Sequence, residues 1–311
     1  MSIVMATFNC SHLVKFAVGS VLDGAVSDWE LLVVGDACTD DTEQVVAAFD
    51  DRRITFVNLS TNSGDQAVPN NEGVRRARGR YVAFLNQDDL YFPDHLARCI
   101  DELERTGADL VWVPCAAIRP TTPGALGQHR WEAELFGVPP TPGYSPRAFY
   151  FASSWVFRRD LVTEVGPWRR PDDLYVTPSQ DWLFRAWKSG ADLRFLPHVS
   201  VLVLPSGTRK GSYVNRATFE HEYFAGHMRT DDRFREHLLE SAAVNTVQSC
   251  RYELAQRPWA GIARSVAYPI GSVLTRLRVH PASATMAVWS GSGVGGKGRR
   301  VRAIRRFTGL R

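Results

Sequence analysis

The N-terminal third of the chain alternates short apolar runs with segments whose apolar residues repeat at helical spacing. The apolar runs have strand length and lie at 2–8, 29–35, 53–59, 79–85 and 108–114. The helical patterns lie between them, at 11–27, 40–50, 66–78 and 93–107. Near-continuous apolar strands separated by helices are typical of a parallel sheet that is covered on both faces. The pattern therefore predicts an α/β, doubly wound, mostly parallel sheet flanked by helices, with ligands bound beyond the carboxyl ends of the strands.

The next hundred or so residues are less regular. Residues 114–150 are rich in Pro, Gly and aromatic side chains, and we expect them to cross the molecule without regular structure. A strand and a helix are predicted at 154–166, a helix at 179–190, and one or two strands at 193–205. These elements would complete the sheet.

Beyond about residue 215 the pattern is mostly helical, and a Gly/Ser linker occupies 290–298. We expect one domain at 1–213, formed by a nucleotide-binding half at 1–113 and an acceptor half at 114–213. A helical, basic C-terminal extension would occupy 214–311.

Charge is distributed unevenly along the chain. The net charge is +4 over 311 residues, but Glu253 is the last acidic residue. Residues 257–311 contain ten Arg and Lys297 and no acid. This region has no recognised nucleic-acid-binding motif, so we expect no nucleic acid partner.

The apolar residues of this basic tail include Val301, Ile304 and Phe307, which recur at spacing three. Cations beside an apolar stripe suit the headgroup region of an anionic membrane, which predicts peripheral membrane contact. The alternative is an extension that packs on the core and ends in a disordered, solubilising segment.

Cysteine usage and hydropathy indicate the compartment. The chain has five dispersed cysteines without a C-x-x-C pair, which is typical of reduced thiols rather than of disulfides or a zinc site. Neither a signal peptide nor an apolar run long enough to span a membrane is apparent. We expect a cytoplasmic protein. If the basic tail contacts lipid, the protein would lie at the inner face of the cell membrane.

Polar residues collect where the predicted strands end. They are Thr7, Phe8 and Asn9, then Asp36, then Asn62 with Gly64, and then Asn86, Gln87, Asp88 and Asp89. Because these strand ends share one edge of a parallel sheet, the side chains should converge. Carboxylates at such an edge suggest Mg²⁺ or Mn²⁺ holding a phosphorylated ligand. The glycines form neither a Walker loop nor a G-x-G-x-x-G turn, which disfavours P-loop NTPases and dinucleotide-binding dehydrogenases.

Six segments in this order resemble a family 2 glycosyltransferase of the GT-A fold, over residues 2 to about 213. They are "SIVMATFN", "WELLVVGDACTDDT", "NSG", "RARGRYVAFLNQDDLYFPDHL", "VFRRDLVTEVGPW" and "SQDWLFRAWKSG". The resemblance implies an inverting enzyme that uses a nucleotide-diphosphate sugar and Mn²⁺ or Mg²⁺. Neither the sugar nor the acceptor can be identified from the chain.

The resemblance also implies roles for individual residues. The residues that would bind the nucleotide sugar are Ala6, Thr7, Phe8, Asn9, Asp36, Asn62, Gly64, Asn70, Asn86 and Gln87. Asp36 would accept a hydrogen bond from the base, and Asp88 would be the metal ligand. For Asp89 three interpretations stay open: it contacts the ribose, caps the next helix, or faces water.

This chain departs from the family pattern at three positions. The family usually has Asp where this chain has Gly35 and Asn86, and Arg where it has Asn70. The missing carboxylates predict a weaker electrostatic hold on the metal, and the missing Arg leaves the identity of the nucleotide open.

A second group of residues lies in "SQDWLFRAWKSG". If this segment is helical, Asp181 and Arg185 are four residues apart and meet on one face. They would form a surface ion pair, or, as the resemblance implies, Asp181 would be the general base. An acceptor hydroxyl is a poor nucleophile at neutral pH and needs a carboxylate to take its proton.

Three further residues are candidates from the C-terminal part of the domain. Arg209 and Lys210 would neutralise the charge of the leaving diphosphate, unless they lie in a solvated loop. His198 is a second candidate metal ligand, with packing against the core as the alternative.

The leading hypothesis is an inverting, metal-dependent glycosyltransferase that acts on a glycan or lipid-linked acceptor in cell-envelope or surface polysaccharide assembly. The alternative from another class is a degenerate module that binds a nucleotide sugar without turnover. Gly35, Asn70 and Asn86 favour the alternative, and the intact Asp88 and Asp181 favour the enzyme.

Overall fold

The structure is a computed structural model in which part of the chain is described. The described residues are 1–120, 131–139, 143–174, 176–204, 216, 218–256, 272–278 and 280–281. Arg209, Lys210 and the Gly/Ser linker at 290–298 lie outside these ranges, as does most of the basic tail.

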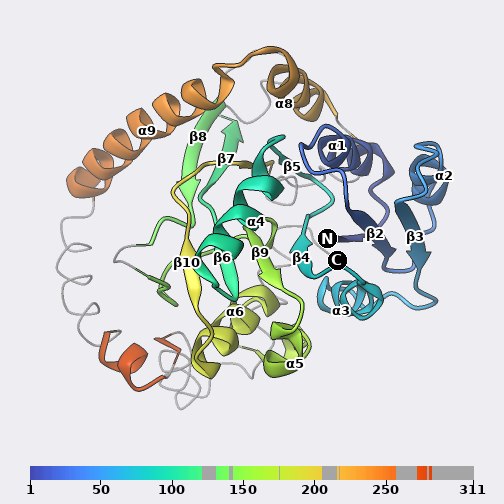
Figure 1. Cartoon of the computed structure of the whole chain (residues 1–311). Helices are drawn as coiled ribbons and strands as arrows, with labels where there is room; N and C mark the ends of the chain where they lie inside the picture. Colours follow the sequence, from blue (N-terminus) through green and yellow to red (C-terminus); the bar gives the residue numbers. More distant parts are fainter. Residues whose placement is uncertain are drawn as a thin grey trace.

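A seven-stranded sheet forms the centre of the molecule (Figure 1). Its strands are β1 (Ser2–Thr7), β2 (Glu30–Gly35), β3 (Ile54–Asn58), β4 (Tyr81–Phe84), β6 (Leu110–Trp112), β9 (Trp155–Arg158) and β10 (Leu193–Phe195). They follow the order β10-β6-β9-β4-β1-β2-β3, and all pairings are parallel except those of β9. The prediction of a doubly wound, mostly parallel sheet is confirmed. The strand order reverses between β1 and β4, which is where such sheets bind ligands.

Helices cover both faces of this sheet. One face packs against α1 (Ser11–Leu22), α2 (Thr42–Ala47) and α4 (His95–Thr106). The other packs against α3 (Ala67–Arg76), α5 (Leu161–Val165) and α6 (Pro178–Ser189). Gly107 ends α4 with φ of 72°, a conformation that glycine adopts without the strain of a side chain. The cores on the two faces explain why the strands are apolar along their whole length.

A second, four-stranded sheet was not predicted. It has the order β5-β11-β7-β8 and consists of β5 (Asp89–Tyr91), β11 (Val201–Val203), β7 (Cys115–Pro120) and β8 (Trp131–Phe136). The expectation that 114–150 lacks regular structure is therefore wrong for β7 and β8, which pair antiparallel. The other partner of β7 is β11, 86 residues further along the chain, so local composition carried little of the signal.

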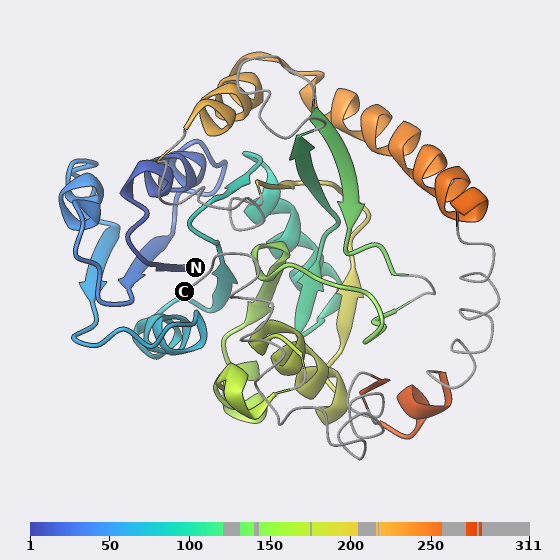
Figure 2. The ribbon, with the colours of Figure 1, turned by 180° about the vertical axis from the view of Figure 1, so that it is seen from behind.

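Two helices of the C-terminal extension pack on this second sheet. Helix α8 (Phe219–Thr230) lies beside α1, and α9 (Phe234–Gln256) runs along β8 (Figures 1 and 2). Phe224 and Leu238 join Leu202 of β11 in one buried cluster. Of the two alternatives for the extension, packing on the core is found for these two helices. No helix within the described ranges is both long enough and apolar enough to cross a membrane.

Two short 3₁₀ helices complete the described elements that matter for the site. They are η1 (Ala152–Ser154), which leads into β9, and η2 (Pro171–Asp173), which precedes α6. η1 lies next to the end of β4, and its residue Ser153 is completely buried.

Candidate active site

The carboxyl ends of β1 and β4 are joined by one side chain. The Gln87 Oε1 atom accepts hydrogen bonds from Thr7 Oγ1 at 2.8 Å and from the Phe8 backbone N at 3.0 Å. These bonds bridge the point where the strand order reverses. Phe8 itself is 41% exposed, so its ring is available at this edge.

The turn between β4 and β5 buries the second of its two carboxyl groups. Asp89 is only 1% exposed, and its Oδ2 accepts from Ser153 Oγ at 2.5 Å and from Asn86 Nδ2 at 2.8 Å. Burial, together with the neighbouring charge of Asp88, raises the pKa of Asp89 to about 8. At neutral pH the adjacent pair therefore does not carry two full charges.

The structure decides two of the three interpretations of Asp89. It does not face water, because it is buried, and it does not cap α4, whose N-cap residue is Asp94. The third, contact with a ribose, stays a prediction.

Asp88 is the half-buried carboxylate of the pair. No group of three or more His, Cys, Asp or Glu side chains that could hold a metal is found among the described residues. Mg²⁺ and Mn²⁺ sites of nucleotide enzymes often use one or two carboxylates, with substrate phosphates and water completing the shell. The donor set around Asp88 fits such a shared site and does not fit a cage made by protein alone.

Beyond β2, the predicted residues Asp36, Asn62 and Gly64 do come together. The Asp36 carboxylate accepts from Ser63 N at 2.9 Å, from Ser63 Oγ at 2.9 Å and from Gly64 N at 3.0 Å. Asn62 Nδ2 donates to the Asp36 backbone O at 2.8 Å. Asp36 is 4% exposed, so it organises the loop after β3. Its hydrogen bond to a base stays a prediction.

The loops after β1 and β2 are locked together by Asn9. Its backbone adopts φ of 48°, and its Oδ1 accepts from Thr39 N at 2.7 Å and from Asp40 N at 3.3 Å. Ala6, also a predicted site residue, pairs in register with Val34 near the ends of the same two strands. Asn9 thus has a structural role in shaping this edge.

The structure explains why the chain has Gly35 where the family usually has Asp. A Cβ atom at Gly35 would lie 2.6 Å from Asn58 Oδ1 and 3.0 Å from Cys38 Sγ. The Asn58 side chain fills that space, accepting from Cys38 N at 2.8 Å and donating to Cys38 O at 2.9 Å. Asn58 therefore holds the loop after β2.

The other two departures differ in their surroundings. Asn86 is fixed by Asp89 and, through its backbone N, by Ser153 Oγ at 3.0 Å. Asn70 lies on α3 and is 3% exposed. A contact between Asn70 and the nucleotide stays a prediction.

Asp181 lies in the first turn of α6, as expected from the helical pattern. Arg185 Nε donates to Asp181 Oδ2 at 2.8 Å, which confirms that the two residues meet on one face. The Arg185 guanidinium also donates to the backbone O of Val165 and of Pro167. Arg169 approaches the other Asp181 oxygen at 3.8 Å. The Asp181 side chain is 13% exposed, so it is not a surface ion pair.

Aromatic residues surround α6. Trp155 and Trp182 stack with ring centroids 6.0 Å apart and are buried in the core. Tyr144 lies near Asp181, and burial, the Tyr150 phenol and the Asp181 charge all raise the pKa of Tyr144. The Tyr144 phenol therefore stays neutral at neutral pH.

His198 does not reach Asp88. Its Nε2 lies 2.7 Å from Asp94 Oδ2, and Arg235 donates to the same carboxylate at 2.5 Å. Although burial favours the neutral acid, these hydrogen bonds lower the pKa of Asp94. The pairing of β5 with β11 places Val203 opposite Asp89 and leaves His198 at the other end of the ladder. His198 is thus a partner of Asp94, which corrects the suggestion of a metal ligand.

Arg209 and Lys210 fall outside the described residues. The nearest described residues before and after them, Leu204 and Arg216, both lie at the site. Leu204 follows β11, and its backbone hydrogen-bonds the Asp89 carboxyl. Arg216 donates to Ser11 Oγ at 2.6 Å and to Asp41 Oδ1 at 3.2 Å. The roles of Arg209 and Lys210 stay predictions.

Sequence reasoning missed four residues that shape this edge. They are Asn58, Ser153, Arg216 and His221 of α8, whose Nε2 lies 2.9 Å from the Asp88 backbone O. None belongs to a recognised motif, and each contacts a partner at least 20 residues away in sequence. A signal for them exists only in three dimensions.

The fold and site define an α/β protein that presents a carboxylate and polar loops at the reversal point of its sheet. The chain belongs to the family described as Glycosyl transferase family 2, whose model matches residues 2–166. The expected family and GT-A-type fold are therefore confirmed.

Two curated relatives match part of the chain. A putative teichuronic acid biosynthesis glycosyltransferase, TuaG of Bacillus subtilis, is 37% identical over 103 residues, which cover 32% of this chain and 40% of TuaG. The Escherichia coli protein WfgD, a UDP-Glc:α-D-GlcNAc-diphosphoundecaprenol β-1,3-glucosyltransferase, is 34% identical over 96 residues, covering 31% of this chain and 38% of WfgD. The matches thus span well under half of either relative.

A solved structure resembles a larger share of the chain. TarS 1–349 from S. aureus, in complex with UDP-GlcNAc, has a TM-score of 0.55 and covers 78% of this chain and 70% of its own. At 17% identity this similarity shows the fold alone.

Proposed function

We propose that the chain is an inverting, metal-dependent glycosyltransferase that moves a sugar from a nucleotide-diphosphate sugar to a hydroxyl of a glycan or lipid-linked acceptor. The observation that carries this proposal is the half-buried Asp88 carboxylate at the reversal point of the sheet, beside the polar loops after β1 and β2. The family match and the fold of the UDP-GlcNAc complex of TarS support the same class of donor.

On the donor side, Asp88 would hold Mn²⁺ or Mg²⁺. Such an ion, when bound, neutralises charge on the diphosphate as it leaves. Gln87 and Asn9 fix the loops around the nucleotide, and the exposed ring of Phe8 offers an apolar surface to the base. These residues bind and orient the donor.

On the acceptor side, Asp181 would take the proton of the attacking hydroxyl. The hydroxyl oxygen forms a bond to the anomeric carbon, the bond from that carbon to the diphosphate breaks, and the diphosphate leaves with the electron pair. A single displacement of this kind inverts the anomeric configuration. Arg185 and Arg169 hold the carboxylate of Asp181 in place. A well-placed general base of this kind contributes about a hundredfold or more to the rate.

The relatives indicate the setting of the reaction. TuaG is named for teichuronic acid biosynthesis, and WfgD for transfer to a diphosphoundecaprenol-linked sugar. By analogy, this chain would act in cell-envelope or surface polysaccharide assembly, at the cytoplasmic face of the membrane. The basic tail would provide peripheral contact with anionic lipid.

The decisive experiment offers purified protein a panel of nucleotide sugars with Mn²⁺ or Mg²⁺ and an acceptor extract, and identifies the released nucleotide. We expect one donor to be consumed, dependent on metal. Binding of a donor without release of nucleotide in any combination would instead establish the degenerate binding module. The pairing of Asn86 with Asp89, which leaves one accessible carboxylate, is the observation that favours that alternative.

The membrane contact has its own test. The full chain and a truncation after Gly298 are sedimented with vesicles that contain anionic lipid, at low and high salt. Salt-sensitive binding of the full chain that is lost on truncation is expected. Failure of both proteins to bind at low salt would exclude the contact.

A further inference from the structure

The turn at 86–89 is held from several sides. Ser153 of η1 fixes its first residue, and Thr7 and Phe8 fix the side chain of Gln87. Ser153 also fixes the carboxyl of the last residue. All of these partners lie within the segment that matches the family model.

Two further contacts come from outside that segment: the Leu204 backbone hydrogen-bonds the Asp89 carboxyl, and a side chain of α8 reaches the backbone of Asp88. His221, 55 residues beyond the end of the family match, places its Nε2 2.9 Å from the backbone O of Asp88. Since a carbonyl oxygen only accepts, Nε2 is the donor and carries a proton. His221 is 3% exposed, so water cannot readily replace this bond.

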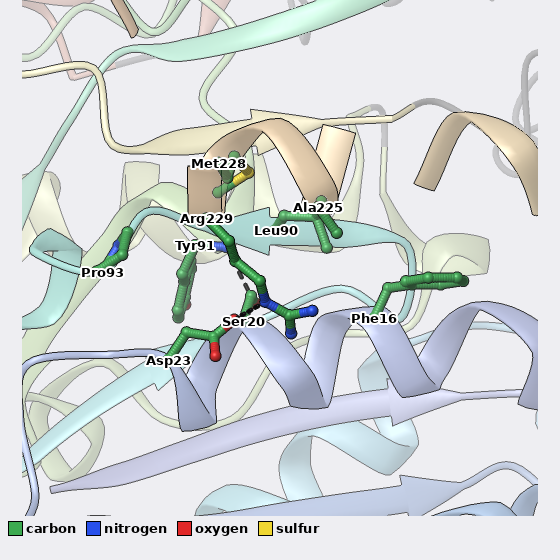
Figure 3. A pocket seen from close by; sticks show the side chains of 9 residues that line it. All are labelled: Phe16, Ser20, Asp23, Leu90, Tyr91, Pro93, Ala225, Met228 and Arg229. Atoms are coloured by element: carbon green, nitrogen blue, oxygen red, sulfur yellow. Dashed lines mark hydrogen bonds and ion pairs between the residues drawn. The ribbon is translucent and has the colours of Figure 1, made fainter. Parts of the chain in front are cut away.

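Helix α8 is itself fastened so that His221 is held in place. The imidazole packs against the Phe16 ring of α1, with centroids 5.7 Å apart. Further along α8, Arg229 pairs at 2.6 Å with Asp23, the residue that directly follows α1. Figure 3 shows this seam, where side chains of α1, β5 and α8 face one another around a narrow cavity. The seam fixes α8 against both α1 and the strand that follows Asp88.

We propose that His221 is a positioning residue for Asp88, so that the C-terminal extension forms part of the donor site. The bond fixes the peptide plane between Asp88 and Asp89 and with it the direction in which the Asp88 side chain leaves the turn. Asp89 follows this peptide and is buried against Ser153, so a rotation of the peptide that moved Asp88 would also strain the hydrogen bond between Asp89 and Ser153. The consequence for catalysis rests on the proposed function.

The test compares three variants. His221→Leu removes the donor and keeps an apolar side chain against Phe16, while His221→Gln restores an N–H near the position of Nε2. His227→Leu is the matched control, because His227 lies on the same helix but hydrogen-bonds the Tyr223 backbone O and packs on the rings of Tyr223 and Phe234, all outside the turn at 86–89.

Hydrogen exchange of peptides covering 86–91 measures positioning in the metal-free protein. We expect faster exchange in His221→Leu, a wild-type rate in His227→Leu, and recovery in His221→Gln. Unchanged exchange in His221→Leu, or equal change in His221→Leu and His227→Leu, would overturn the proposal.

Titration of nucleotide-sugar binding with Mn²⁺ measures the consequence. Loss of a residue that orients a metal ligand typically weakens metal binding by about tenfold or more. We expect such a shift in His221→Leu only. If the wild-type protein shows no metal-dependent donor binding, the proposed function fails, and the exchange experiment still decides whether His221 positions the turn. A wild-type Mn²⁺ midpoint in His221→Leu would overturn the role in the donor site.

Discussion

The two sheets of the protein contribute to the candidate site in different ways. The seven-stranded sheet supplies the strand ends from which Thr7, Asp36 and Asp88 emerge. The four-stranded sheet begins at Asp89, directly after the candidate metal ligand, and is covered by α8 and α9. One sheet therefore presents the chemical groups, and the other holds the turn that carries one of them.

The same contrast applies to the two adjacent aspartates. Asp88 is half-buried between the sheets, whereas Asp89 is the first residue of β5 and is enclosed by Asn86 and Ser153. Two like charges side by side are unfavourable, and burying one of them as the neutral acid removes that repulsion. Identical side chains one residue apart thus have different environments, because Asp88 lies in the turn and Asp89 begins a strand of the small sheet.

The largest expected effect breaks this contrast at Asp88. Asp88→Asn should reduce transfer by about a thousandfold, because a cation on the leaving diphosphate supplies several kcal/mol of charge stabilisation. Asp89→Asn is the matched control and should be milder, since Asp89 is already mostly neutral at pH 7. Initial rates at saturating metal measure both. Near-normal turnover of Asp88→Asn would disprove the assignment.

The second effect concerns Asp181, the carboxylate in the first turn of α6. Asp181→Asn keeps the shape of the side chain but cannot accept the proton, so turnover should fall by about a hundredfold. Donor affinity should change little. Asp192→Asn, which alters an exposed carboxylate paired with Arg194, is the control. If Asp181→Asn lost donor binding in the same proportion, Asp181 would have a structural role.

The large sheet was predictable because its signals are local. Apolar runs marked the strands, helical spacing marked the helices, and strand-end polar residues marked the site, including the meeting of Asp181 with Arg185. The position of Gly107 at the end of α4 was likewise readable from the sequence.

The small sheet was not predictable for the opposite reason. β5 and β11 have three residues each, and β7 pairs with a strand 86 residues further along the sequence, Ala116 with Leu202 among others. Contacts such as that of His221 with Asp88 cross 133 residues and leave no periodic pattern. The pairing of His198 with Asp94, beyond the far end of β5, likewise left no local signal in the sequence.

The third prediction compares two glycines, one in each region. Gly35→Ala should destabilise the protein by about 1–3 kcal/mol, because the added Cβ overlaps Asn58 Oδ1. Gly226→Ala on α8 meets nothing within 4 Å and should stabilise by up to about 1 kcal/mol through helix propensity. Urea unfolding measures both.

A double-mutant cycle sharpens the Gly35 result. Asn58→Ala alone loses the two hydrogen bonds to Cys38, but it also removes the atom that Gly35→Ala would meet. The double variant should therefore cost less than the sum of the single changes. Strict additivity would show that Asn58 is not what excludes a side chain at Gly35.

The last effect is a pH dependence of stability that involves the contact between α4 and the start of β11. His95 of α4 is completely buried, with Nδ1 2.9 Å from Ser200 Oγ, close to the start of β11, and burial lowers its pKa to about 3. The unfolded chain binds this proton near pH 6.5 and the folded protein does not, so stability falls as pH drops from about 6.5 towards 3. The slope from one such group is at most about 1.4 kcal/mol per pH unit. Asp94, whose pKa is lowered below its ordinary value, loses its contribution to stability only below about pH 4, so the pH ranges of the two groups are separable.

His95→Asn keeps a partner for Ser200 and should flatten the fall of stability between pH 6.5 and 4.5 in urea unfolding of the metal-free protein. An unchanged slope in that interval would mean that His95 is not the buried group that makes the packing around the small sheet sensitive to acid.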